Sequence, residues 1–426
     1  NVSITDSTAT LTITDDDATP SLSIADVTAG NENAANHTFT VSLSAASGRD
    51  ITVDYATSNG TATAGADYTA TSGTLTISAG ATSGTFNVPV LADTNFEMSE
   101  TATIADGWSR LNDMPVGKWE PATTVIDGQL YVFGGYEDNI ASSKRADIYD
   151  PATDTWTEMQ RLPSAISHVN LVLDEGGIWF AAGMKDKRQP AKDFIIDEVW
   201  RYSMEQDRYI AAPLLPGRRA GGGLAKIGDH LHYISGLMED RDSDASEHWV
   251  LDLKTWEHEG APDKGWSEAA PFPLPRNQFS TAVLNDEIYC IGGQFNHDSQ
   301  QLDQPDVDIY DPVSDSWRKG PPLHYGHSHS EGATFTYGDN IFMVGGHSTP
   351  EGGKKGFSSD VLTLPAGGDW QLVCQLPKPT SSPAASIIDD KLYFAGGWNG
   401  GMDENNVWLM SQEVWVREGI IAELVA

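Results

Sequence analysis

A unit of about 50 residues recurs six times in the last three quarters of the chain, and this repeat restricts the fold more than any other feature. Each unit begins with a Pro-led mark and runs through an apolar stretch of strand length to a small residue followed by Gly. The marks are Met114-Pro115, Leu162-Pro163, Leu215-Pro216, Leu274-Pro275, Pro321-Pro322 and Leu376-Pro377. The small pairs end at Gly135, Gly183, Gly236, Gly293, Gly346 and Gly397. Because one such unit cannot bury its own apolar face, six units predict a closed array with these glycines at equivalent strand ends.

A second regularity is a pair of aromatic residues seven positions apart, separated by a polar turn. Such a pair predicts a strand-turn-strand corner whose rings fill the gap between neighbouring units. The pairs are Tyr149 and Trp156, Tyr202 and Tyr209, Trp249 and Trp256, Tyr310 and Trp317, and Trp408 and Trp415. The fifth unit departs from the pattern, with Thr363 before Trp370.

Residues 149–156 and 310–317 share the pattern Tyr-Asp-Pro-x-x-Asp-x-Trp. With the six repeats, this corner makes the region from about Trp108 to Trp415 resemble a kelch β-propeller of the bacterial secreted type. The resemblance implies an all-β ring of six four-stranded blades. Residues 107–111 and 413–417 both have the pattern of an outer strand, and either could complete the last blade. The seven-residue spacing favours the C-terminal segment.

The first 106 residues have a different composition, with thirteen acidic residues and one basic residue, Arg49, and no Trp or Cys. Short alternating strands separated by Gly-rich turns predict a β-sandwich. The expected strands lie at 21–24, 38–43, 51–55, 74–77 and 85–90. Residues 59–68, together with 72–76 and 88–94, resemble a Calx-beta domain, which implies an immunoglobulin-like fold that often binds calcium.

The resemblance covers residues 20–105 and omits the last strands and the Asp-rich end of the family. Residues 1–17 resemble the end of a preceding Calx-beta unit, so the chain is expected to start within a domain. We therefore expect four parts: that terminal strand at 1–17, an incomplete sandwich at 18–106, the propeller at 107–418 and a tail at 419–426. The spare strand could pair with the open edge of another copy, which would give head-to-tail self-association, a filament, by strand addition.

The net charge of −35 argues against nucleic acid and anionic membranes as partners. No apolar run is long enough for a transmembrane helix, so no membrane span is expected. Cys290 and Cys374 fall in strands of different units, which favours two buried free thiols over a disulfide.

Calcium is the one cofactor that the Calx-beta resemblance implies, and no organic cofactor is expected. Calcium binds six to eight oxygens, mainly carboxylates. The resemblance assigns the ligands to seven acidic residues: Asp15, Asp16, Asp17, Asp67, Asp93, Glu97 and Glu100. A solvated acidic edge is the alternative.

Two groups in the propeller are candidate sites. His324, His327 and His329 could bind a transition metal, although a structural role at the start of a strand is favoured. Segments after the Pro-led marks should share a face with the loops after the small pairs. A ligand-binding face there would use the residues Arg218, Arg219, Arg276, His327, His329 and Trp398. Packing and salt bridges at the blade entrance are the alternative role.

These features favour a structural or adhesion protein of the bacterial cell surface or extracellular space over an enzyme, and no catalytic residue is assigned. Its Calx-beta part would act as a calcium-stiffened stalk, and its propeller would bind a protein or glycan partner. The alternative is a secreted sugar-acting enzyme that resembles the kelch-type sialic acid mutarotases or, less so, the copper radical oxidases. An enzyme should show acid, base and Arg side chains converging in a closed axial pocket, whereas a binding protein should show a broad open face.

Overall fold

The computed structural model describes most of the chain and divides it into two compact units, 1–107 and 108–426, which are treated separately here. The described residues are 22–24, 27, 36–59, 62, 64–65, 67–91, 102–106, 108–185, 195–254, 256, 265–297, 301–349, 355–403 and 406–420.

The first unit contains two three-stranded antiparallel sheets. One sheet has the order β1 (Leu22–Ile24), β2 (Asn36–Leu43) and β5 (Ser83–Pro89). The other has the order β4 (Ser72–Ile77), β3 (Ile51–Asn59) and β6 (Ala102–Asp106). Val41, Val53, Ile77 and Phe86 are among the buried side chains between the strands. This arrangement agrees with the predicted sandwich.

Strand β6 corrects one detail of the sequence interpretation. The resemblance omits the last strands of the family, but residues 102–106 form a strand that pairs with β3, from Asn59↔Ala102 to Tyr55↔Asp106. Strand β3 is therefore paired on both sides by the chain's own strands, β4 and β6.

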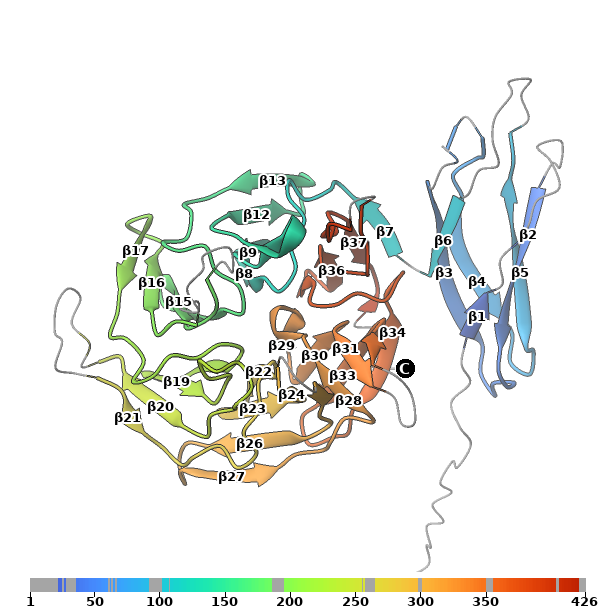
Figure 1. Cartoon of the computed structure of the whole chain (residues 1–426). Coiled ribbons are helices and arrows are strands. Elements are labelled where there is room, and N and C mark those ends of the chain that lie inside the picture. The colour runs from blue at the N-terminus through green and yellow to red at the C-terminus, as the bar shows by residue number, and fades with distance from the viewer. Residues whose placement is uncertain are drawn as a thin grey trace, which may run out of the picture. The chain divides into compact units, whose positions relative to one another are not determined.

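The second unit is a ring of six four-stranded antiparallel sheets, the blades of a β-propeller (Figure 1). Blade 1 consists of β8 (Ala122–Ile126), β9 (Gln129–Phe133), β12 (Ala146–Asp150) and β13 (Thr155–Glu158). Blade 2 consists of β14 (Asn170–Asp174), β15 (Gly177–Ala181), β16 (Val199–Ser203) and β17 (Arg208–Ala211). Blade 3 consists of β18 (Gly223–Ile227), β19 (His230–Ile234), β20 (His248–Asp252) and β21 (Ser267–Glu268). Blade 4 consists of β22 (Ser280–Leu284), β23 (Glu287–Ile291), β26 (Val307–Asp311) and β27 (Ser316–Lys319). Blade 5 consists of β29 (Thr334–Tyr337), β30 (Asn340–Val344), β33 (Asp360–Pro365) and β34 (Gln371–Gln375). Blade 6 is β35 (Ala384–Ile388), β36 (Lys391–Ala395), β37 (Val414–Arg417) and β7 (Trp108–Leu111).

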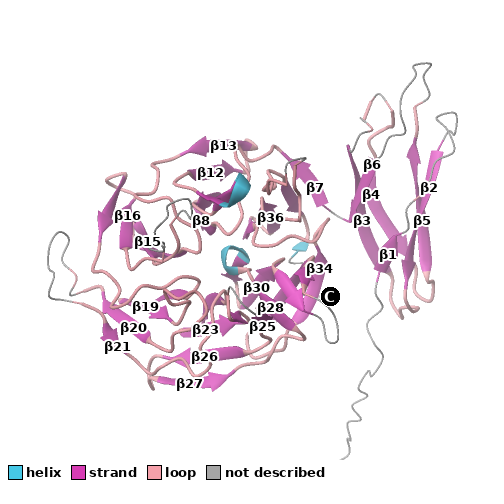
Figure 2. Cartoon of the chain, in the orientation of Figure 1, coloured by secondary structure: helices cyan, strands magenta, loops and turns pink. Residues whose placement is uncertain are grey.

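Short strands and two 3-10 turns decorate the loops between the blade strands (Figure 2). The short strands are β10 (Tyr136–Glu137), β11 (Ala141–Ser142), β24 (Gln294–Phe295), β25 (Leu302–Asp303), β28 (Gly326–Ser328), β31 (His347–Thr349) and β32 (Gly356–Phe357). The turns are η1 (Asp138–Ile140) and η2 (Glu331–Ala333).

The last blade is closed by the N-terminal segment of the propeller, contrary to the preference for the C-terminal one. Strand β37 is the third strand of blade 6, and β7 pairs outside it, with Arg417↔Trp108 and Val414↔Leu111. The two ends of the propeller sequence are thereby joined in one sheet, which removes both free edges.

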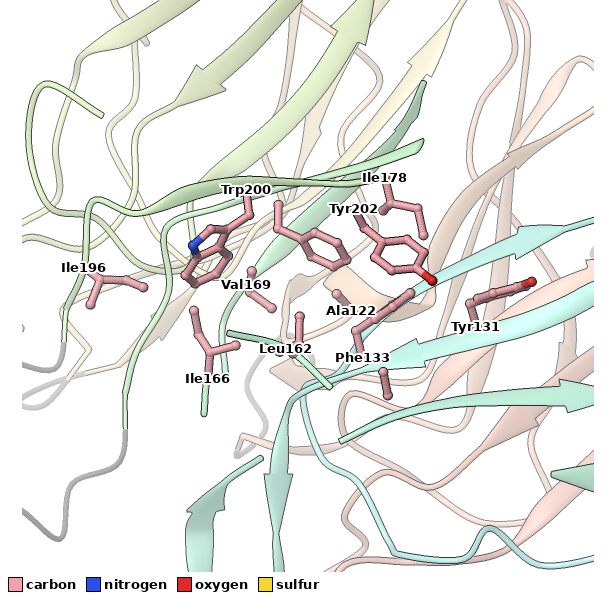
Figure 3. Packing of buried hydrophobic residues seen from close by; sticks show 12 residues of the cluster. Ala122, Tyr131, Phe133, Leu162, Ile166, Val169, Ile178, Ile196, Trp200 and Tyr202 are labelled. Atoms are coloured by element: carbon pink, nitrogen blue, oxygen red, sulfur yellow. The ribbon is translucent and has the colours of Figure 1, made fainter. Parts of the chain in front are cut away.

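Apolar side chains from neighbouring blades form the core of the ring. Between blades 1 and 2, Phe133 packs against Phe180 with ring centroids 5.0 Å apart. Leu162 and Ile166, from the segment that links these blades, fill the same cluster (Figure 3). Each blade therefore covers the apolar face of the next, as the repeat predicted.

The small pairs lie at equivalent ends of the second strands, which confirms their predicted role. All twelve residues of these pairs have positive φ, including Ala182 at 61° and Ser235 at 57°. Space is also limiting, because a Cβ on Gly135 would lie 2.7 Å from the carbonyl oxygen of Trp119. Glycine therefore serves both the left-handed backbone and the close approach of the neighbouring strand.

Two of the Pro-led marks are shifted from their predicted positions. The structurally equivalent residue is buried in every blade and donates its backbone N–H to the preceding blade; these residues are Met114, Leu162, Leu215, Phe272, Leu323 and Leu376. The marks of blades 4 and 5 are therefore Phe272-Pro273 and Leu323-His324, not Leu274-Pro275 and Pro321-Pro322.

One aromatic side chain of each blade donates a hydrogen bond to a backbone carbonyl at the end of the preceding blade. The bonds are Trp156 to Asn112, 3.3 Å; Tyr209 to Gln160, 3.2 Å; Trp266 to Pro213, 3.1 Å; Trp317 to Ala270, 2.9 Å; Trp370 to Pro321, 3.1 Å; and Trp108 to Gln375, 2.8 Å. These six bonds form a rim around the ring.

The predicted corners hold in blades 1, 2 and 4, where the two aromatics are cross-strand partners. They are wrong for the last pair, because Trp415 pairs with Arg110 and Trp408 lies in a loop. In blade 3, Trp249 pairs with Glu268 rather than with Trp256.

Candidate functional site

Loops from all six blades meet on one face of the propeller, which we call the loop face. In each blade the segment before the first strand forms a β-bridge with the loop after the small pair. The bridges are Trp119↔Tyr136, Ser167↔Met184, Ala220↔Leu237, Asn277↔Gln294, Ser328↔His347 and Ser381↔Trp398. The predicted juxtaposition of these two sets of segments is therefore present in every blade.

The residue after each bridge forms a ring around the propeller axis. Its members, which we call the axial ring, are Glu120, His168, Gly221, Gln278, His329 and Ser382, and all have positive φ between 42° and 58°. Backbone N–H groups donate to carbonyls of the preceding member, as in Gln278 to Gly221 at 2.7 Å and Ser382 to His329 at 3.1 Å. The backbone is thus the same at six positions, while the side chains differ.

Three ring side chains converge. The Nδ1 atom of His168 lies 3.0 Å from Oε2 of Glu120, and Nε2 of His329 lies 3.8 Å from Oε1 of the same carboxyl. All three side chains are less than 5% exposed. Burial and the neighbouring histidines and Lys355 hold the pKa of His329 well below its usual range, so its imidazole is neutral near pH 7.

The turn η2 from blade 5 closes the axis beside these residues. It contacts the innermost strands of blades 1, 4 and 6. A Cβ on Gly332 would lie 2.1 Å from the carbonyl oxygen of Pro121, so only glycine fits there. Burial, followed by the charge of Glu120, raises the pKa of Glu331 to about 8, which keeps this carboxyl mainly protonated at neutral pH.

The axial cavity is small. It has a volume of about 10 Å³ and is lined by Glu120, His168, Asn170, Gln278 and Glu331, among others. Oε1 of Glu331 and Nε2 of Gln278 are buried and have no hydrogen-bond partner among the described residues. The cavity has room for roughly one water molecule, and these two atoms would suit it as partners.

A cluster of aromatic side chains, here called the aromatic platform, lies on the loop face over blades 5, 6 and 1. Trp398 and Trp408 stack with centroids 3.9 Å apart and an interplanar angle of 12°. The ring centroid of Trp119 lies 5.6 Å from that of Trp398, and the centroid of Phe357 lies 5.1 Å from that of Trp398. Trp119 is buried, whereas Phe357, Trp398 and Trp408 are partly exposed.

The loop that carries Trp398 and Trp408 extends this apolar surface. Met402 is 49% exposed and Leu409 is 40% exposed. Tyr136 and Met410 support the platform from beneath. An apolar surface held in place in this way suits contact with a partner.

The structure separates the predicted ligand-binding residues into two groups. Trp398 and Arg218 are partly exposed on the loop face, and Nη1 of Arg218 lies 3.0 Å from Oε1 of Glu239. Arg219, Arg276, His327 and His329 are buried.

Arg276 has a structural role instead of the predicted ligand contact. Its side chain is 0% exposed and Nη1 lies 2.7 Å from Oδ2 of Asp308. Its guanidinium also donates to four backbone carbonyls and packs 4.7 Å from the ring of Phe272. Arg219 is similar, paired with Glu247 and stacked over Trp249.

The three histidines of 324–329 diverge. Nε2 of His324 lies 3.2 Å from the carbonyl oxygen of Trp370, whereas Nδ1 of His329 lies 2.7 Å from the hydroxyl of Ser328. Burial lowers the pKa of His327 to about 4. Among the described residues, no three His, Cys, Asp or Glu side chains are arranged to hold a metal ion.

Most of the predicted calcium ligands, Asp15, Asp16, Asp17, Asp93, Glu97 and Glu100, lie outside the described residues. Asp67 is described, and its backbone carbonyl accepts the N–H of Leu91 at 2.9 Å. The calcium site therefore stays a prediction.

Both cysteines are free and buried, as predicted. Burial strongly raises the pKa of the Cys290 thiol, which packs beside Phe279 and Tyr310. Its environment is that of a core residue.

Sequence reasoning missed Glu120, Gln278 and Glu331 at the axis and Phe357 and Trp408 in the platform. The axial ring had a usable signal, since each member stands five residues after the second residue of the corrected mark. This regular spacing was hidden because the marks of blades 4 and 5 were each placed two residues away from the equivalent position. Trp408 was misassigned because of its chance spacing from Trp415.

Comparisons with known proteins agree with both units. A Calx-beta domain model matches residues 15–126, and a Kelch motif model matches 120–163 and 275–324. The Calx-beta match extends beyond the first compact unit, which ends at Gly107. Its last residues, 108–126, belong to the propeller in the structure. The chain thus combines a Calx-beta domain with kelch repeats.

Similar proteins come from several kingdoms. A Kelch repeat-containing protein of Arabidopsis thaliana is 23% identical over 72% of this chain and 75% of its own length. Beta-scruin of Limulus polyphemus is 21% identical over 50% of the chain, and Kelch-like protein terF of Aspergillus terreus is 22% identical over 67%. The chain spans 22% and 62% of those two relatives.

A solved structure titled "Structure of YjhT" has the same fold, with a TM-score of 0.57 and 14% identity over 72% of this chain and 99% of that one. Together, the kelch repeats and the Calx-beta domain indicate a protein-interaction or binding role. None of the described helical segments is long and apolar enough to span a membrane.

Proposed function

We propose that this chain is a non-catalytic binding protein that holds a protein partner on the loop face of its propeller. The observation that carries the proposal is the aromatic platform. Two stacked tryptophans, partly exposed and supported by buried Trp119, supply the rigid aromatic anchors that dominate many protein interfaces. The exposed Met402 and Leu409 on the same loop enlarge the contact.

The axial site argues for binding rather than for a sugar-acting enzyme. Acid and imidazole groups converge there, but the cavity of about 10 Å³ is far smaller than the several hundred Å³ typical of a small-molecule site. Arg276, one of the residues predicted for the ligand-binding face, is buried in an ion pair instead. Glu331, Glu120 and the two histidines are therefore best regarded as the sealed centre of the ring.

The Calx-beta unit would serve as a stalk in an extracellular or cell-surface protein, stiffened by calcium on its acidic loops. Strand addition by residues 1–17 to another copy remains part of this proposal, although β6 already pairs one side of β3. Light scattering of the full chain with calcium, with chelator and after deletion of 1–17 tests it. A chain that stays monomeric at high concentration with calcium contradicts self-association.

The role of the aromatic platform is tested with the full chain and two variants of it. One is a double variant that carries both Trp398→Ala and Trp408→Ala, and the other, Leu372→Ala, is the control. Leu372 is 56% exposed on β34, so the control removes a similar exposed apolar group away from the platform. Surface plasmon resonance against an arrayed panel of purified proteins and glycans should identify protein partners. These should lose at least about tenfold in affinity for the double variant and remain unchanged for the control.

Two outcomes would contradict the proposal. Partners that bind the double variant as well as the native chain would place the interface elsewhere. Binding confined to glycans would make the platform a sugar-stacking surface rather than a protein interface.

A further inference from the structure

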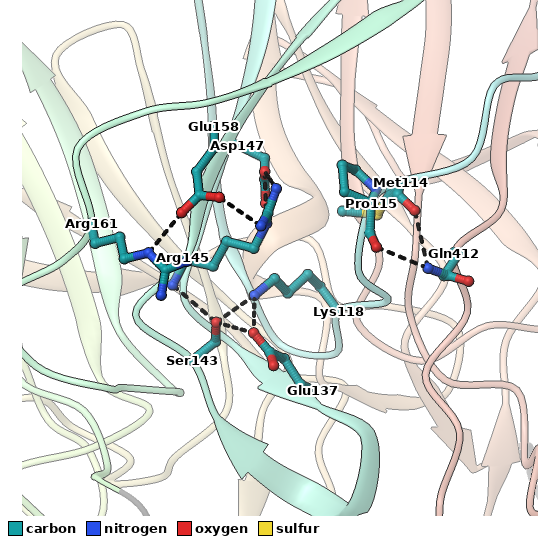
Figure 4. Close-up of polar contacts among 10 residues, drawn as sticks. All are labelled: Met114, Pro115, Lys118, Glu137, Ser143, Arg145, Asp147, Glu158, Arg161 and Gln412. Carbon is teal, nitrogen blue, oxygen red and sulfur yellow. Dashed lines mark hydrogen bonds and ion pairs between the residues drawn. The ribbon is translucent and has the colours of Figure 1, made fainter.

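We propose that a pocket at the edge of blade 1 is a binding site for a small oxyanion carrying a single charge, a carboxylate or a sulfate ester. The pocket has a volume of about 390 Å³, within the usual range of small-molecule sites. Its wall includes Glu137, Ser142, Ser143, Lys144, Arg145 and Arg161. Figure 4 shows four of these residues, Glu137, Ser143, Arg145 and Arg161. This inference is independent of the aromatic platform.

Two separate segments bring the cations together. Lys144 and Arg145 lie between β11 and β12, and Arg161 lies just after β13, at the start of the link to blade 2. The pairing of Ser143 with Ile166 joins these segments across the two blades. A cluster of three basic side chains is unusual in a chain of net charge −35 with only 26 lysines and arginines.

The inner part of the pocket wall is already neutralised and fixed. Arg145 forms a bidentate contact with Asp147, at 2.9 and 2.8 Å from Nε, and its Nη1 lies 2.7 Å from Glu158. Buried Lys118 donates to the hydroxyl of Ser143 and to Oε1 of Glu137. Ser143, which also donates to Glu137, and Lys118 together lower the pKa of Glu137 despite its partial burial. The acids are therefore occupied by Arg145 and Lys118.

The outer part of the wall has donors to spare. Arg161 contacts Glu158 through Nε at 2.6 Å, and its side chain is 62% exposed. Neither of its two Nη groups forms a hydrogen bond or ion pair with another described residue. Lys144 is exposed and donates to the carbonyl of Pro163 at 2.8 Å, which leaves two of its three ammonium hydrogens. The hydroxyl of Ser142 is buried and has no partner within the part of the chain that the structure describes.

These donors favour an anion over a cation. The four basic groups Lys118, Lys144, Arg145 and Arg161 face three carboxylates, Glu137, Asp147 and Glu158, so the cluster has one positive charge in excess. One added negative charge balances it, whereas a multiply charged anion would meet Glu137 in the wall. An Arg fork and a Lys ammonium beside a hydroxyl are the usual donor set for a carboxylate or sulfate.

The experiment uses the full chain and isothermal titration calorimetry at constant ionic strength, with sodium propionate and sodium methyl sulfate as probes and sodium chloride as reference. We expect saturable one-site binding of at least one of the two oxyanions. The Lys144→Gln and Arg161→Gln double variant should weaken it at least about tenfold, and Ser142→Ala less. The probe that binds more tightly, propionate or methyl sulfate, shows whether the site prefers a carboxylate or a sulfate ester.

Arg318→Gln is the matched control, since Arg318 lies in blade 4, is 51% exposed and contacts Glu287 of the same blade. It should bind the probe like the native chain. The proposal is overturned if neither oxyanion binds more than chloride, or if the double variant, shown by its melting temperature to be folded, binds as tightly as the control.

Discussion

The rim and the axis of the propeller use the six-fold repeat in opposite ways. At the rim, an aromatic donor reaches a backbone carbonyl of the preceding blade in all six blades, and five of the donors are tryptophan. At the axis, the backbone repeats as a ring of left-handed residues, but the side chains are those of Glu, His, Gly, Gln, His and Ser. The rim therefore repeats both the type of side chain and its contact, whereas the axis repeats only the backbone conformation.

This difference follows from what each position contacts. A rim aromatic contacts a backbone carbonyl, which is the same group in every blade, so the same residue type is suitable each time. The axial side chains contact one another, and six identical charged or bulky groups could not fill one small centre. The varied axial residues Glu120, His168, His329 and Glu331 are therefore complementary to one another rather than to a repeat.

The largest effect expected is at the rim, where Trp108 closes the ring. Trp108 is 1% exposed, donates to the carbonyl of Gln375 and packs edge-on against Phe394 at 5.2 Å. Trp108→Ala should lower the free energy of unfolding by about 4–5 kcal/mol, because it leaves a cavity and an unpaired carbonyl. Chemical denaturation with Trp408→Ala, in the partly exposed platform, as control should show a loss several-fold smaller. Equal losses would mean that the rim bond does not secure the closure.

The rim and the axis also differ in how much the sequence reveals. The number of blades, the small pairs and three of the corners follow from the sequence, because identical contacts select identical residues at a fixed spacing. Closure by β7 was not predictable from spacing, since β37 has the same strand pattern. The axial cluster depends on contacts between residues up to 211 positions apart, Glu120 and Glu331, which share the same cavity. The pocket beside Arg161 was missed because its cations come from two separate segments, residues 144–145 before β12 and Arg161 after β13.

A second prediction concerns the layer between rim and axis. Arg276 is fully buried and satisfies Asp308 and four carbonyls. Arg276→Ala should cost about 3–5 kcal/mol, because it removes the side-chain donor to four backbone carbonyls and leaves buried Asp308 with only the exposed Lys319 as a charge partner. Arg218→Ala, at a side chain 41% exposed, should change stability by less than about 0.5 kcal/mol. Thermal unfolding of the two variants decides between a structural and a surface role, and a small loss for Arg276→Ala would restore the ligand-binding interpretation.

A third prediction tests the axis through pH. The pKa of Glu331 is raised from 4.5 to about 8, so between these values the folded state binds more protons than the unfolded state. Stability is therefore lost as the pH rises through this window, by on the order of 3 kcal/mol at pH 7 relative to pH 4. Glu331→Gln should remove this loss, which is measured as the difference in unfolding free energy between variant and native chain at pH 5, 7 and 9. A difference that does not change with pH would show that Glu331 titrates normally.

The smallest effect has the opposite sign and belongs to a histidine pair between blades 3 and 4. Nδ1 of His232 lies 3.0 Å from Nε2 of His248, whose Nδ1 lies 3.2 Å from the Ala270 carbonyl that also accepts the rim bond of Trp317. Burial is the main cause that lowers the pKa of His232 to about 3 and that of His248 to about 4.

From pH 6.5 down to about 4 the unfolded state binds more protons, so stability falls with decreasing pH, by about 2 kcal/mol per histidine at pH 5. His232→Gln keeps a donor toward His248 and removes one titrating group, so the loss between pH 7 and pH 5 should shrink by about 2 kcal/mol. The other buried histidines with a lowered pKa, which include His248, His327 and His329, keep their contributions. Glu331→Gln should instead enlarge that loss by about 2–3 kcal/mol, because the native Glu331 stabilises the folded state as the pH falls from 7 to 5. If His232→Gln leaves the acid dependence unchanged, the pair is not the acid-sensitive link between these blades.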